Sequence, residues 1–248
     1  MPTPFMHMAL AHRMNTDAVV PSDIRSAIQA DWGAFLLGQV APDARVSSGL
    51  QRPQTHFFDY QPIIDPPAPQ VMLTKHPELR RPRTTDPSQA AFVAGYVAHL
   101  VVDEVWCMEA LYPLFSEWGT MPMRFHMLHM LLGFLDERDY TTLPSSDYAP
   151  MHNAAPDHWL PFMTDADLIV WRDLIADQLP SVGRNLTYDI LSKRIDQTPE
   201  QMADFVHNTQ EMQTQLWSNV PPDKIAHVEQ DMYARSRQTV IDYYTDTI

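Results

Sequence analysis

The chain has 248 residues, of which 45% are hydrophobic, and its formal net charge is −14. This length allows one large domain or two small ones with a real core, and the composition excludes a disordered chain. The negative charge disfavours binding to nucleic acid or to an anionic membrane surface unless bound cations offset it locally.

Cysteine usage and hydropathy bear on the location of the protein. Cys107 is the only cysteine, so there is no disulfide framework. The amino-terminal stretch MPTPFMHMALAHRM is too short and too polar for a signal peptide. No run of about 18 apolar residues is present to span a membrane. These features predict a cytoplasmic protein that meets its substrate from the aqueous side.

Helical periodicity and capping signals dominate the chain and predict an all-α fold. Glycine is scarce, with 7 residues, whereas the 22 prolines lie mostly between apolar periodic segments, as in helices joined by stiff loops. We expect a helical core over residues 1–140 and C-terminal helices over residues 141–248 that pack on this core, together in one domain.

The first predicted helix covers residues 4–14 and carries His7 and His12 on different faces. A second helix begins at the capping signal Pro-Ser-Asp of residues 21–23 and ends at Gly38 and Pro42. Asp43 follows directly, and alone it is typical of a loop residue that bonds to its own backbone.

Residues 44–85 carry no convincing helix. They contain His56 in the sequence THFFDY, where aromatic neighbours predict partial burial. They also contain RRPR at residues 80–83, which we expect to be a solvated turn or, alternatively, a contact for an anionic substrate.

The central segment is apolar nearly throughout, AFVAGYVAHLVVDEVWC at residues 91–107, yet holds His99 and Asp103 four residues apart. On a helix this spacing places both side chains on one face, and a helix that is apolar all round is buried. Small residues one and two turns earlier on the same face of the helix, such as Gly95, leave room for another segment. The helix is expected to run from residue 86 to about residue 118, with a break at Pro113.

A buried carboxylate requires a partner, which leaves two interpretations of Asp103. Either an Asp103–His99 or Asp103–Arg pair only holds helices together, or Asp103 and His99 bind a cation jointly.

The next apolar helix, residues 123–139, carries three further polar side chains that can share one side, namely His126, His129 and Asp136. They are additional metal-ligand candidates, or alternatively core residues whose histidines are satisfied by backbone carbonyls. After a loop at residues 141–158, capping signals predict helices to the C-terminus, with His207 and His227 facing solvent.

Imidazole and carboxylate groups recur in or beside the apolar segments, at His7, Asp43, His56, His99 and Asp103. Such a set suits zinc. The motifs of several competing enzyme classes are absent, including H-E-x-x-H, an adjacent His-Asp pair, C-x-x-C, G-x-S-x-G and a Walker-type loop.

The ordered phrases F-L-L-G-x-x-A-P-D, T-H-F and G-Y-x-x-H-L-x-x-D, after an early helical histidine, resemble the bacterial zinc-dependent phospholipase C family. The resemblance covers roughly residues 4–136. It implies an all-α fold around a buried metal cluster, with ligands at matching positions: His7, Asp43, His56, His99 and Asp103. Asp103 corresponds to the carboxylate that bridges two metals, and Asp43 to a ligand that is also the base for the attacking water.

The activity implied by the resemblance is zinc-dependent hydrolysis of a phosphodiester bond, with two or three zinc ions and attack by metal-bound hydroxide. The substrate would be a small phosphoester or a phospholipid. Two alternatives remain, a non-catalytic zinc-stabilised helical module and a hydrolase of another phosphoester. The chain departs from the family pattern at Glu109, where the family carries a histidine.

Overall fold

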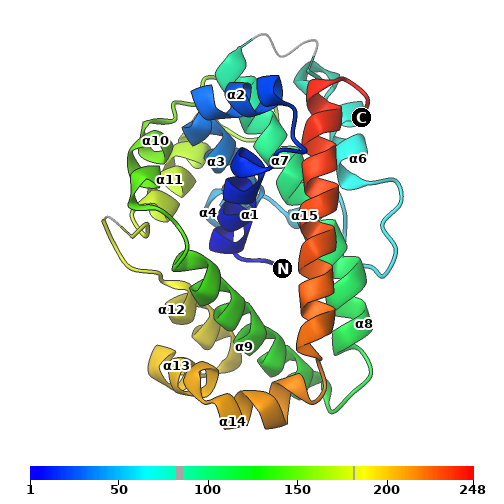
Figure 1. Ribbon diagram of the computed structural model, residues 1–248, viewed down its shortest axis with the longest axis vertical. Helices are drawn as coiled ribbons and strands as arrows, with labels where there is room; N and C mark the ends of the chain where they lie inside the picture. The colour runs from blue at the N-terminus through cyan, green and yellow to red at the C-terminus, as the bar shows by residue number, and fades with distance from the viewer. Residues whose placement is uncertain (82–85, 181) are drawn as a thin grey trace.

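The computed structural model describes residues 1–81, 86–180 and 182–248, and within these ranges it contains helices, turns and loops but no strand (Figure 1). The prediction of an all-α fold is confirmed. The helices, in chain order, are α1 (Pro4–Thr16), α2 (Ser22–Ala30), α3 (Trp32–Val40), α4 (Arg45–Ser48), α5 (Arg52–Thr55), α6 (Ala68–Lys75), α7 (Pro87–Val105), α8 (Tyr112–Phe115), α9 (Met121–Tyr140), α10 (Tyr148–Asn153), α11 (Asp165–Ala176), α12 (Thr187–Leu191), α13 (Pro199–His207), α14 (Thr209–Glu211) and α15 (Pro222–Tyr244).

Helix α7 is the centre of the fold, and every residue from 90 to 105 is buried. Its N-terminus is capped by Asp86, whose side chain accepts hydrogen bonds from the backbone N–H groups of Ser88 and Gln89. The helix continues through a π-helical turn, Trp106–Leu111, into α8. The helical segment thus ends at Phe115 instead of residue 118, and the irregularity precedes Pro113 instead of falling on it.

Helices α3 and α7 cross in backbone contact at Gly38 and Gly95. A Cβ atom on Gly95 would lie 2.3 Å from the carbonyl oxygen of Phe35, and one on Gly38 would lie 2.1 Å from that of Phe92. Neither position therefore tolerates a side chain without a shift of the helices. We expected another segment to approach the face of the central helix that carries Gly95, and the contact with α3 confirms this.

The single helix predicted after residue 21 is divided into α2 and α3 at Asp31, which adopts a non-helical conformation with φ −121° and ψ 42°. Its side chain accepts a 2.5 Å hydrogen bond from the hydroxyl of Ser88 at the start of α7. A tertiary contact therefore accompanies a break that local propensity did not indicate.

The expectation that residues 44–85 lack helix is wrong for three short segments, α4, α5 and α6. Gln51 and Gln54 form a capping box that closes the first turn of α5, although Gln51 stands where the usual pattern has Ser or Thr. Of the RRPR run, only Arg80 and Arg81 belong to the described residues.

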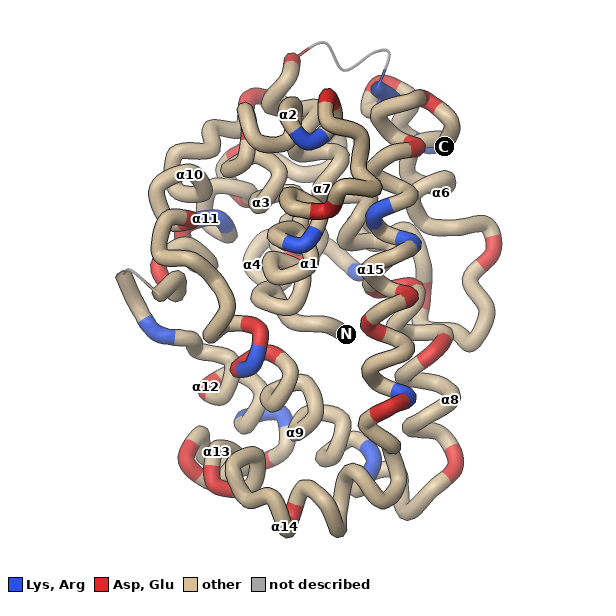
Figure 2. Tube along the Cα trace, viewed as in Figure 1, with Lys and Arg blue, Asp and Glu red and all other residues tan. Residues whose placement is uncertain are grey.

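Of the C-terminal helices, α15 packs along α7 and α13 against α9, and α9 in turn packs against α1 (Figure 1). The capping boxes at Thr164 and Thr198 confirm the predicted starts of α11 and α13. Helix α10 lies within the predicted loop. The apolar stretch Pro87–Phe115 is the described helix long and apolar enough to cross a membrane, but 94% of its most apolar window is buried inside the protein. Figure 2 shows Asp and Glu residues at many places along the helices and turns.

Candidate metal centre

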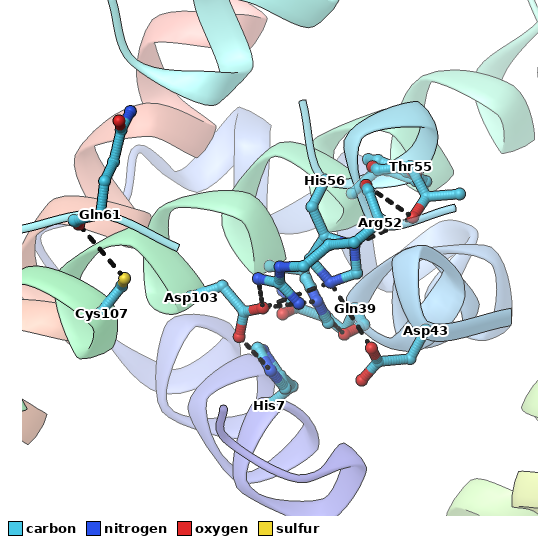
Figure 3. A network of polar contacts seen from close by, with 11 residues as sticks. His7, Gln39, Asp43, Arg52, Thr55, His56, Gln61, Asp103 and Cys107 are labelled. Atoms are coloured by element: carbon cyan, nitrogen blue, oxygen red, sulfur yellow. Dashed lines mark hydrogen bonds and ion pairs between the residues drawn. The ribbon is translucent and has the colours of Figure 1, made fainter. Parts of the chain in front are cut away.

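Four parts of the fold bring the five predicted ligands together beside α7 (Figure 3). They come from α1, the 3₁₀ turn Ala41–Ala44, the C-terminal cap of α5, and α7 itself: His7, Asp43, His56, His99 and Asp103. Two overlapping groups of three residues each place one ligand atom per residue within 4.8 Å of one another. The first group is His7, His99 and Asp103, and the second is Asp43, His56 and His99.

The imidazole–carboxylate distances in this cluster exceed those of ordinary hydrogen bonds. His7 Nε2 lies 3.6 Å from Asp103 Oδ1, and His56 Nε2 lies 3.3 Å from Asp103 Oδ2 and 3.5 Å from Asp43 Oδ1. His99 Nε2 lies 3.8 Å from Asp103 Oδ2. Tetrahedral ligands at about 2.0–2.1 Å from a zinc ion are about 3.3 Å apart. The spacing thus suits donors that share an ion.

Partners on the far side of two rings leave their Nε2 atoms available. The backbone oxygen of Gln39 lies 2.7 Å from His99 Nδ1. Because this oxygen can only accept, Nδ1 carries the proton and Nε2 a lone pair. The hydroxyl of Thr55 lies 2.9 Å from His56 Nδ1. Nε2 of His7, His56 and His99 is buried without a hydrogen-bond partner among the described residues. Such orphaned nitrogens require an explanation, and a bound cation supplies one.

Arg52 is a member of this site that the sequence analysis missed. Its Nη2 donates a 2.8 Å hydrogen bond to Oδ2 of Asp103, and the residue is only 8% exposed. The Asp103–Arg pair that we considered as an alternative is therefore present. It satisfies one oxygen of Asp103, whereas Oδ1 remains without a hydrogen-bond partner among the described residues. The only sequence signal was an arginine four residues before His56.

The electrostatics of the cluster favour anionic carboxylates and a neutral His99. Burial lowers the pKa of His99 to about 3. Burial would raise the pKa of Asp103, but its polar neighbours outweigh burial and hold that pKa well below the usual range. Interactions with His99, His56, His7 and Arg52, in decreasing order, all act to lower that pKa. The pKa of Asp43 is also lowered, since its contact with His56 outweighs burial. Metal binding requires these protonation states.

The amino group of Met1 adds a further titratable group near the carboxylates. Burial lowers its pKa, while Asp103 and Asp43 act to raise it.

The cluster reaches solvent at Asp43, whose side chain is 19% exposed, whereas those of His56 and Asp103 are at most 1% exposed. Tyr60 lies nearby and is 47% exposed, and its ring centroid is 4.5 Å from the guanidinium carbon of Arg52. Of the five candidate ligands, Asp43 is thus the one that a small molecule in solvent can reach.

The three additional candidates on α9 do not form a comparable group. His129 Nδ1 lies 2.8 Å from the backbone oxygen of Phe125, as the core-residue alternative expected. Asp136 is fully buried and accepts a 2.7 Å hydrogen bond from Asn185. No group of three possible ligands among the described residues includes His126, His129 or Asp136.

Other polar residues singled out in the sequence lie outside the cluster. Glu109 pairs with Arg235 on α15. His207 and His227 are exposed as predicted, with side chains 60% and 69% accessible. A third group, Asp157, His158 and Asp165, lies in an exposed loop, where acidic residues commonly gather without a metal.

Comparison with known proteins finds no match to the chain among family models, curated proteins or solved structures. The resemblance to the zinc-dependent phospholipase C family therefore stays a prediction.

Proposed function

We propose that the protein is a zinc-dependent hydrolase of phosphodiester bonds. The observation that carries the proposal is the convergence of three unpartnered imidazole nitrogens and two carboxylates at one buried place. Among the described residues, the three Nε2 atoms and Oδ1 of Asp103 are buried without a hydrogen-bond partner, which would cost free energy if they stayed so. The donor set, nitrogen from imidazole and oxygen from carboxylate, is one that zinc accepts.

The residues fit such an ion chemically. His7, His99 and Asp103 offer one set of three donors, and Asp43 and His56 extend it toward solvent. Zinc would lower the pKa of a water molecule and withdraw charge from a phosphoryl oxygen. In this protein the Gln39 carbonyl holds the His99 ring in its ligand tautomer, and Asp103 neutralises positive charge on the buried side.

Asp43 is the residue best placed to take a proton from an attacking water. It is the partly exposed carboxylate of the cluster, and its lowered pKa keeps it anionic at neutral pH. A general base must lie within hydrogen-bond reach of the water that it activates, and only a carboxylate facing solvent meets that condition here.

The substrate class follows from charge together with the family resemblance. A protein with a net charge of −14 repels anions, and a cationic centre locally reverses that effect. A small phosphodiester or a phospholipid head group entering beside Asp43 would be attracted to such a centre. A cytoplasmic location agrees with the single, buried Cys107.

The main alternative is a non-catalytic module in which zinc only stabilises the helices. The burial of four of the five candidate ligands is compatible with it. Partial exposure of Asp43 favours catalysis, because a purely structural site is usually closed.

The deciding experiment is a panel of chromogenic phosphodiesters and phosphocholine lipids, assayed with and without chelator. We expect turnover that is lost with chelator and restored by zinc. A protein with a full metal site and no turnover on any member would be the structural module. If phosphomonoesters or nucleotides, assayed beside the panel, are hydrolysed and the phosphodiesters are not, the protein is instead a hydrolase of another phosphoester.

A further inference from the structure

Arg52 occupies a position that a metal ion would need. Its Nη2 atom is 2.8 Å from Oδ2 of Asp103. Oδ2 is also the carboxylate oxygen nearest to the Nε2 atoms of His56 and His99, at 3.3 and 3.8 Å. An ion that used this oxygen together with His56 would compete with the guanidinium group for it.

The position of Arg52 is built into the fold. The residue begins α5, the short helix closed by the capping box of Gln51 and Gln54. Its guanidinium carbon lies 4.8 Å from the ring centroid of Phe58 and 4.5 Å from that of Tyr60. Cation–π contacts of this kind favour a charged group beside the rings. Arg52 is thus held by its own helix, by two aromatic rings and by Asp103.

The donor atoms of the cluster provide three ligands for only one metal ion at a time. The two groups of three ligands share His99, and that ring can offer only Nε2, because Nδ1 is bonded to Gln39. With His99 and Asp103 Oδ1 given to the group of His7, only Asp43 and His56 remain for a second ion. Their natural third ligand is Asp103 Oδ2, which Arg52 holds.

Charge balance also favours a single divalent ion in this cluster. As carboxylates, Asp43 and Asp103 contribute two negative charges, and the guanidinium group of Arg52, paired with Asp103, offsets one of them. One divalent ion then leaves this cluster with a single positive charge, which a phosphodiester monoanion cancels. A second divalent ion would leave an excess of three positive charges in a buried site, which is costly.

We propose that Arg52 serves as the second cation of this site, so that the protein binds one divalent ion tightly instead of two or three. This inference rests on the proposed metal centre. It goes beyond that proposal by assigning to an arginine the charge that a further zinc ion would otherwise supply.

The test counts zinc ions per chain after equilibrium dialysis, by elemental analysis, for the wild type, Arg52→Gln and Arg45→Gln. We expect one tightly bound ion in the wild type and two in Arg52→Gln, where Asp103 Oδ2 is released. Arg45 is a matched control, since it lies nearby in sequence but forms no ion pair with either cluster carboxylate among the described residues. Arg45→Gln should bind one ion.

Two or three tightly bound ions in the wild type would overturn the inference and leave the proposed function standing. One ion in both the wild type and Arg52→Gln would also overturn it. No ion in any protein would overturn the proposed metal centre itself. If Arg52→Gln fails to fold, titration of the wild type with Co²⁺ still decides, because its visible absorption should saturate at one equivalent and not at two or three.

Discussion

The backbone oxygen of Gln39 accepts a 2.7 Å hydrogen bond from Nδ1 of His99. This contact joins α3 to α7, and it depends on the close crossing of the two helices at Gly38 and Gly95. The Gln39 carbonyl therefore fixes the tautomer of a candidate metal ligand, and two glycines let the helices come close enough for it to do so.

Gly95→Ala should disturb both stability and metal binding. The new Cβ atom would lie 2.3 Å from the oxygen of Phe35, so the helices must separate. We expect a loss of about 2–3 kcal/mol in the free energy of unfolding, measured with urea, and weaker zinc binding.

Gly133→Ala is the matched control for Gly95→Ala. Its Cβ would meet the flexible end of the Met202 side chain at 2.5 Å and the Tyr188 ring at 2.9 Å, but no backbone atom, and alanine favours the helix by about 1 kcal/mol. A smaller effect is expected there. Equal stability of Gly95→Ala and the wild type would contradict the tight crossing.

Removal of the His7 side chain should cost metal, whereas removal of the His12 side chain should not. His7 is fully buried beside Asp103. His12 lies on another face of α1 and contacts Asp147 through a 2.6 Å hydrogen bond. Zinc content by elemental analysis should fall in His7→Ala and stay unchanged in His12→Ala. Equal loss in both variants would indicate a general effect on α1.

The helices with strong periodicity were predictable, because burial of an apolar stripe determines them locally. Helix α7 is the clearest case, since its apolar run and the Asp86 cap were both visible in the sequence. The break at Asp31 and the short helix α5 were not, because a contact to Ser88 and an unusual Gln–Gln capping box accompany them.

The candidate ligands could be found from residue types, but their environment could not. His56 and Asp103 were predicted as neighbours through an ordered family pattern. Arg52 escaped prediction, because nothing in its own sequence context places it against a residue 51 positions later. Conversely, the spacing of His129 and Asp136 suggested a shared site, yet their observed partners are Phe125 and Asn185.

Asp43→Asn should impair turnover far more than folding. The substitution keeps the shape of the side chain but removes the proposed base. We expect kcat for a phosphodiester to fall by about 10²- to 10⁴-fold, with an unchanged circular dichroism spectrum. Asp59→Asn, at an exposed position near His56, is the control and should keep full activity. Retained activity in Asp43→Asn would exclude Asp43 as the base.

Zinc should stabilise the folded protein, because the ligand set is assembled only after folding. A free zinc concentration about 100 times the dissociation constant adds about 2.7 kcal/mol. For a chain of this size that corresponds to a rise of about 5–10 °C in the melting temperature. Calorimetry with and without chelator measures it. Asp103→Asn should show no such rise, and an unchanged wild-type melting temperature would contradict metal binding.

Asp139 should make the protein less stable as the pH rises from about 4 to 6. Burial raises its pKa from 3.8 to about 6, although contacts with Arg138 act in the opposite direction. The folded state therefore binds the proton more tightly than the unfolded state does. The free energy of unfolding falls as pH rises through this window, and the loss is complete above the folded-state pKa. The shift corresponds to about 3 kcal/mol.

Asp139→Asn removes this loss, so at pH 7 the variant should exceed the wild type in stability, by less than that amount because the contact with Arg138 is weakened. Urea unfolding between pH 4 and pH 8 measures both curves. Asp157→Asn, at a side chain that is 89% exposed, should run parallel to the wild type. Parallel curves for Asp139→Asn would show that Asp139 titrates alike in the folded and unfolded states.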